Sequence, residues 1–113
     1  MNPSIHKELA AGRWFTLSTL EQLGNIGSEF ERAATADQRG DRERFDKAFE
    51  RMLELMDLTV ADPKWHTGSR LRELLRLREE VCDFFCGKEI FGTPIEALRK
   101  YFLYFGIAAR ISR

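Results

Sequence analysis

Residues 17–36 constrain the fold most, because they combine a helix start signal with apolar residues at helical spacing. Ser18 and Glu21 are three residues apart and can form a capping box, in which each side chain bonds the other residue's backbone amide. Gly24 and Gly27 follow one turn apart, where each costs about 1 kcal/mol relative to alanine. We therefore expect both glycines to lie against a closely packed neighbouring helix, with contact to a ligand as the alternative.

The rest of the chain also shows helical spacing. Asp41 and Thr93 are suited to cap helix starts, whereas Pro63 and Gly87 are suited to end helices. The expected helices span residues 3–11, 17–36, 41–61, 69–86 and 93–111. Helices joined by short connections pack most simply as an antiparallel bundle. The sequence thus predicts an all-α fold: an antiparallel four-helix bundle with a short N-terminal helical segment, formed by residues 1–113 as a single domain.

The third expected helix, residues 69–86, is rich in leucine. Its apolar face is assigned to Leu71, Leu74, Leu75, Val81, Cys82 and Phe85, with Leu77 and Phe84 widening it. Arg78 falls on this face, where an unpaired charge is unfavourable. We expect it to pair with a carboxylate of the first two long helices, Glu54, Asp57, Glu21 or Glu29. In the connection that follows, Ile90 and Phe91 are expected to turn inward.

The composition indicates a globular protein and limits the classes of partner. Apolar residues make up 43% of the chain and charged residues 32%, as in ordinary folded domains. The 18 basic and 18 acidic residues balance, which argues against a general nucleic-acid-binding protein. Because no apolar run approaches a membrane span and the first residues lack the apolar core of a signal peptide, we expect a cytoplasmic protein that does not bind membranes.

Residues that often carry chemistry are few. His6 and His66 lack the preceding glutamate of a bundle di-metal site, and His66 is interpreted as an ordinary residue of the loop at 62–69. Cys82 and Cys86 lack the second pair of ligands that zinc requires, so we expect them to pack as small apolar side chains. We predict no catalytic residue and no cofactor.

Two acidic pairs form the one candidate metal site. Glu54 and Asp57 lie on the second long helix, and Glu80 and Asp83 lie on the third. Magnesium favours carboxylate oxygens together with substrate phosphates, and the order of the pairs resembles the all-α nucleotide pyrophosphohydrolases. Both pairs fall on polar faces expected to face water, so we predict no metal site. A magnesium-dependent enzyme of that kind, using these four carboxylates, is the alternative.

Basic residues gather on the last two helices and suggest an RNA-binding surface as a further alternative. They are Arg70, Arg72, Arg76, Arg78, Arg99, Lys100, Arg110 and Arg113. Glutamates and aspartates interleave with those of the third helix, so a neutralised surface is the main interpretation.

Segments 21–29, 55–59, 70–74 and 100–105 resemble an uncharacterised family of short prokaryotic four-helix proteins. In size and helix order the chain is also similar to HEPN-type proteins, which often work in toxin–antitoxin pairs. HEPN ribonucleases carry an arginine four to six residues before a histidine. No arginine has that position before His66 or His6, so this resemblance implies an inactive or partner-type member.

The last helix carries two apolar stripes, whereas a helix of a monomeric bundle needs only one. The second stripe comprises Leu103, Tyr104, Ile107 and Ile111. We predict that it is a homodimer interface. Cover by the N-terminal segment, through Ile5, Leu9, Trp14 and Phe15, is the alternative. The predicted function is accordingly that of a non-enzymatic interaction protein, with a further protein partner possible.

Overall fold

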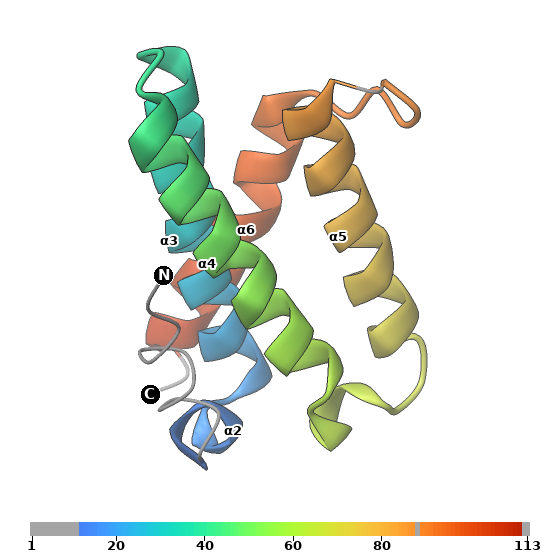
Figure 1. Ribbon diagram of the computed structural model, residues 1–113. Helices are drawn as coiled ribbons and strands as arrows, with labels where there is room; N and C mark the ends of the chain where they lie inside the picture. The colour runs from blue at the N-terminus through green and yellow to red at the C-terminus, as the bar shows by residue number, and fades with distance from the viewer. Residues whose placement is uncertain (1–11, 88, 112–113) are drawn as a thin grey trace.

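The computed structural model describes the backbone of residues 12–87 and 89–111 and the side chains of residues 12–87 and 89–104. This part of the chain is helical and contains no strand (Figure 1). Its helices are α2 (Trp14–Thr16), α3 (Thr19–Gln38), α4 (Arg42–Val60), α5 (Arg70–Cys86) and α6 (Ile95–Ile111), with a short 3-10 helix, η2 (Pro63–Trp65). The all-α prediction is confirmed. The expected helix at 3–11 lies outside the described residues.

Local signals set the helix starts. In the capping box of α3, the Glu21 amide donates to Ser18 Oγ over 3.1 Å and the Ser18 amide donates to Glu21 Oε1 over 3.0 Å. Asp41 caps α4 by accepting from the Arg44 amide at 3.2 Å. These bonds satisfy amides that have no partner within the helix. The predicted caps of α3 and α4 are therefore confirmed.

The helix ends follow from backbone requirements. Gly87 closes α5 in the left-handed region, with φ of 69°, and its amide donates to the Asp83 carbonyl. Such a φ is unfavourable for residues with a Cβ, which explains the glycine. The segment after α4 holds η2, where Asp62 accepts from the Lys64 amide at 3.0 Å.

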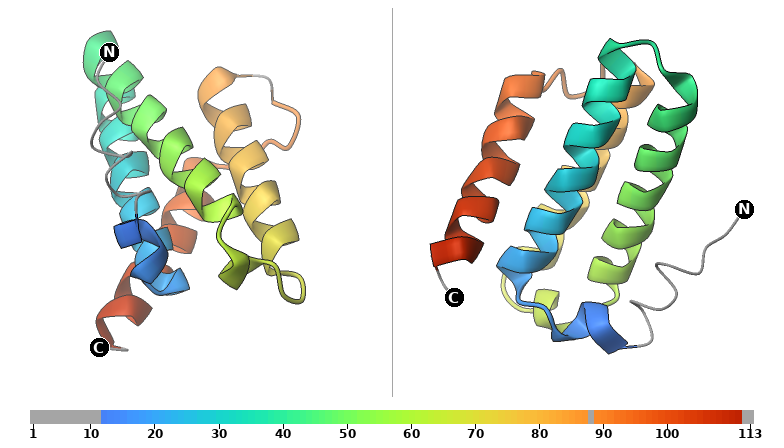
Figure 2. Two further views of the ribbon diagram at one scale, coloured as in Figure 1. Left: turned by 60° about the horizontal axis from the view of Figure 1, so that its bottom comes forward. Right: turned by 90° about the vertical axis from the view of Figure 1, so that its left-hand side faces the viewer.

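Helix α3 lies between α4 and α6 and packs along both, while α5 contacts α4 (Figure 2, right). Helices α3 and α6 approach each other closely at Gly27. A Cβ built there would lie 2.8 Å from the Cβ of Phe102 on α6. The absence of a side chain at Gly27 is therefore what lets α3 and α6 approach at this point. Gly24, one turn earlier, is half-buried.

The core has two parts. The larger gathers side chains from α2 through α6 around Phe30, whose ring centroid lies 5.5 Å from Phe85 and 5.1 Å from Phe102. The smaller lies beneath the turn between α3 and α4 and consists of Ala33, Ala36, Phe45 and Ala48. Among the described helices, none combines the length and apolar composition needed to cross a membrane.

The buried face of α5 differs from the expected one. Leu77 belongs to the core, whereas Leu75, placed on the apolar face by the sequence, is 41% exposed. The predicted inward turn of Ile90 is also wrong, because its side chain is 71% exposed. Phe91 is partly buried, and the Arg76 guanidinium lies 4.3 Å from its ring centroid.

Candidate functional site

Three of the four carboxylates of the candidate magnesium site serve separate structural contacts. Asp83 is buried, and it accepts from the amides of Ile90 at 2.7 Å and Phe91 at 3.2 Å. The expectation that this residue faces water is therefore wrong: its carboxylate fixes the backbone after α5. Glu80 accepts from the Thr93 hydroxyl and pairs with Arg76, whose Nε lies 3.2 Å away.

On α4, Asp57 is engaged in a contact of its own. Asp57 Oδ1 lies 3.2 Å from Arg78 Nε, which confirms that Arg78 has an acidic partner on α4. The two groups form an ion pair without a hydrogen bond, because the buried Nε of Arg78 has no hydrogen-bond partner. Glu54 lies one turn earlier on α4. Among the described residues, no three histidine, cysteine, aspartate or glutamate side chains gather closely enough to hold a metal ion.

A buried polar cluster joins α2, α3, α4 and η2. Gln22, fully buried, donates through Nε2 to the Trp14 carbonyl at 3.0 Å and to Asp62 Oδ2 at 2.8 Å. Its Oε1 accepts from Trp65 Nε1 at 2.8 Å. Trp14 Nε1 donates to the Thr59 hydroxyl at 3.2 Å. Because these polar groups bond to one another, the cluster serves to hold α2, α3, α4 and η2 together.

Asp62 is the charged member of this cluster. Burial alone raises the pKa of its carboxyl, but hydrogen bonds from Lys64 and Gln22 outweigh burial and hold the pKa below the ordinary value of 3.8. Lys64 Nζ lies 2.8 Å from Asp62 Oδ2 and donates to the Phe15 carbonyl at 2.8 Å. The carboxylate therefore stays ionised inside the protein at neutral pH.

Among the remaining candidates, His66 and Cys82 have structural environments, whereas Cys86, expected to pack as a small apolar side chain, is exposed. A ring nitrogen of His66, Nε2, lies 2.7 Å from the Val60 carbonyl, so that the imidazole ties the loop to the end of α4. Burial raises the pKa of the Cys82 thiol; the nearby Arg78 guanidinium opposes this effect in part, and Cys86 and Asp57 make smaller contributions that raise the pKa. Cys82 is consequently a protonated, weakly nucleophilic thiol at neutral pH.

The proposed interface on α6 is exposed where the structure describes it. Leu103 is 57% exposed and Tyr104 is 68% exposed. The side chains of Ile107 and Ile111 lie outside the described residues. Trp14, one of the residues considered as cover for this surface, is instead buried in the core.

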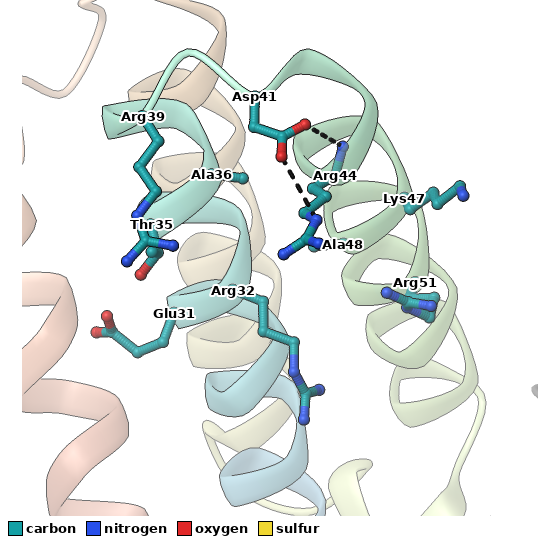
Figure 3. A pocket seen from close by; sticks show the side chains of 10 residues that line it. All are labelled: Glu31, Arg32, Thr35, Ala36, Arg39, Asp41, Arg44, Lys47, Ala48 and Arg51. Carbon is teal, nitrogen blue, oxygen red and sulfur yellow. Dashed lines mark hydrogen bonds and ion pairs between the residues drawn. The ribbon is translucent and has the colours of Figure 1, made fainter.

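Sequence reasoning missed an open pocket of about 600 Å³ between α3 and α4 (Figure 3). Two rows of side chains line it, each at spacing i, i+3, i+4 and i+7. The first row is Arg32, Thr35, Ala36 and Arg39, and the second is Arg44, Lys47, Ala48 and Arg51. This shared spacing, with alanine at the same place in both rows, is the sequence signal that could have found the pocket. Glu31 and Asp41 complete its lining.

The charges of the pocket are unevenly paired. Arg44 Nε lies 3.4 Å from Asp41, and Lys47 Nζ lies 3.5 Å from Glu43, both between largely exposed side chains. On the other side of the pocket, Glu29 lies 2.9 Å from Arg32 and 3.5 Å from Arg51. Arg39 makes no ion pair with any carboxylate of the described residues.

Comparison of the chain with protein-family models, with curated proteins and with solved structures gives no match. The resemblances drawn from the sequence accordingly stay predictions.

Proposed function

We propose that this is a non-enzymatic helical-bundle interaction protein that forms a homodimer through α6. The observation that carries the proposal is the exposure of two large adjacent side chains, Leu103 and Tyr104. In the sequence, Ile107 and Ile111 extend the same helical face by one and two further turns. Contiguous apolar surface of this kind generally marks an interface.

A twofold dimer suits this helix. In a C2 arrangement the stripe meets its own copy, so that one set of residues supplies both halves of the contact. Tyr104 combines a large apolar ring with a polar tip, as is common at interfaces. The balanced charge of 18 basic and 18 acidic residues gives little repulsion between copies. The proposed setting is the cytoplasm, with which the free thiols of Cys82 and Cys86 agree.

Light scattering of the full chain at micromolar concentration tests the dimer. We expect a dimer mass for the wild type and a folded monomer for Leu103→Glu, because the substitution would place a charge inside the contact. Leu75→Glu is the matched control, since Leu75 is a partly exposed leucine on a different helix. A monomer mass for the wild type would reject the proposal, as would equal dissociation by both variants.

The other two functions considered have less support. In a magnesium enzyme Asp83 would have to leave the backbone amides that it now binds. For an RNA-binding surface, Arg76, Arg78 and Arg99 would have to leave carboxylate partners on α5, α4 and α3. Partner-type membership of a toxin–antitoxin pair remains compatible with the proposed interaction role.

A further inference from the structure

We propose that the pocket between α3 and α4 binds a small ligand that carries a chain of phosphates, such as a nucleoside triphosphate or an inorganic polyphosphate. The pocket belongs to the α3–α4 hairpin, and none of the α6 side chains that the structure describes lines it. The proposal is therefore independent of self-association through α6.

The arrangement of basic side chains fits a chain of phosphates rather than a single anion. One arginine stands at each end of each row, at positions 32 and 39 on the α3 side and 44 and 51 on α4. Seven residues of helix span about 10 Å. Several linked phosphate groups are needed to contact cations spread over such a distance. Arginine can bind phosphate oxygens through two parallel hydrogen bonds, which makes it well suited to this role.

The floor of the pocket explains why it is hollow. Ala36 and Ala48 are 4% and 2% exposed and lie at the same place in the two rows. Their short side chains leave space between longer flanking side chains. Thr35 adds a hydroxyl group to the lining on the α3 side. A volume of about 600 Å³ lies within the usual range for small-ligand pockets.

The two carboxylates of the lining do not oppose an anion strongly. Asp41 caps α4 and lies beside Arg44 (Figure 3). Glu31 points toward α6, where its carboxylate accepts from Arg99 Nε at 3.0 Å. Among the described residues, five cations and two carboxylates line the pocket, an excess of three positive charges (5 − 2), and Glu29 and Glu43, which lie beside the lining, pair with three of the cations.

At the end of the pocket near the α3–α4 turn, little must be broken for the ligand to bind, whereas at the other end Arg32 and Arg51 would have to share their contacts with Glu29, at 2.9 and 3.5 Å. Arg39 has no carboxylate partner among the described residues. The pairs of Arg44 and Lys47 join exposed side chains, and such pairs contribute little to folding stability. Exchange of these weak pairs for contacts with phosphate oxygens is therefore favourable, and it should not disturb the fold.

Isothermal titration calorimetry of the full chain with sodium tripolyphosphate, and separately with ATP without added metal, tests the proposal. We expect saturable binding, and we expect Arg39→Gln and Arg44→Gln each to weaken it about tenfold, as the loss of one charge-assisted contact would. Arg70→Gln is the control, because it removes the same charge from an exposed site on α5. Circular dichroism should be unchanged in all three variants, since each arginine is exposed.

Equal binding of the two probes would assign recognition to the phosphate chain, and tighter binding of ATP would add the nucleoside; either supports the proposal. Absence of binding for both probes at about 1 mM would overturn it. So would an equal loss in Arg70→Gln, because that result would reflect general charge. Binding of a uridine decanucleotide without binding of tripolyphosphate or ATP would replace the proposal by a nucleic-acid surface. Light scattering of the same variants shows separately whether they still form the dimer proposed for α6.

Discussion

At the scale of single residues, Asp62 makes the stability of the protein at low pH depend on one buried polar cluster. Its pKa in the folded protein lies below the ordinary value of 3.8, so its ionised form contributes stability above that value. The contribution is lost as the pH falls from 3.8 through the folded pKa. We expect the urea midpoint of the wild type to fall between about pH 5 and about pH 3 more than that of Asp62→Asn. Parallel midpoint curves for the two proteins would contradict this assignment.

Gln22 shows why the cluster was not foreseen. As one polar residue in an otherwise apolar helical face, it gave no sign of a partner. Its bonds to Asp62 and Trp65 span 40 and 43 residues of sequence. Pairings over such separations depend on how the helices pack, which periodicity does not specify.

At the scale of the helix, Gly27 sets the distance between α3 and α6. A leucine there would place its Cβ 2.8 Å from that of Phe102 and force the two helices apart. We expect Gly27→Leu to lower the free energy of unfolding by roughly 1–3 kcal/mol through overpacking. Urea denaturation measures the change. Ser28→Leu, at the exposed neighbouring position, is the volume control and should change stability by less than about 0.5 kcal/mol. An equal loss in both variants would mean that the contact with Phe102 is not the cause.

Helix boundaries were largely predictable, because caps and stops act through neighbouring residues. Ser18, Asp41 and Gly87 each specify their own helix end. The orientation of α5 was not predictable in the same way. Leucines at 71, 74, 75 and 77 cover much of its circumference, so that several faces have similar apolar character. In the folded protein, the face that contains Leu77 packs against the core. The hydrogen bond from the Ile90 amide to Asp83 fixes the following loop with the Ile90 side chain exposed.

At the scale of the whole molecule, the two proposed binding surfaces differ in how visible they were in the sequence. The α6 stripe is a property of one helix, so its spacing alone predicted it. The basic pocket requires two helices to place matching rows opposite each other across the turn at 39–41. Spacing within each row is visible in the sequence, but the facing of the rows is a result of packing. A site shared by two elements is for this reason harder to predict than a stripe on one.

The position of α3 between α4 and α6, with α5 resting on α4, has a consequence for local opening. Helices that pack on several neighbours open only with the whole fold, whereas peripheral ones open at lower free energy. Amide hydrogen exchange should therefore be slowest at the centre of α3, around Ile26 and Phe30. It should be faster at the centre of α5, around Leu77 and Val81, although all four side chains are buried. Equal protection of the two helices would mean that the molecule opens as a single cooperative unit.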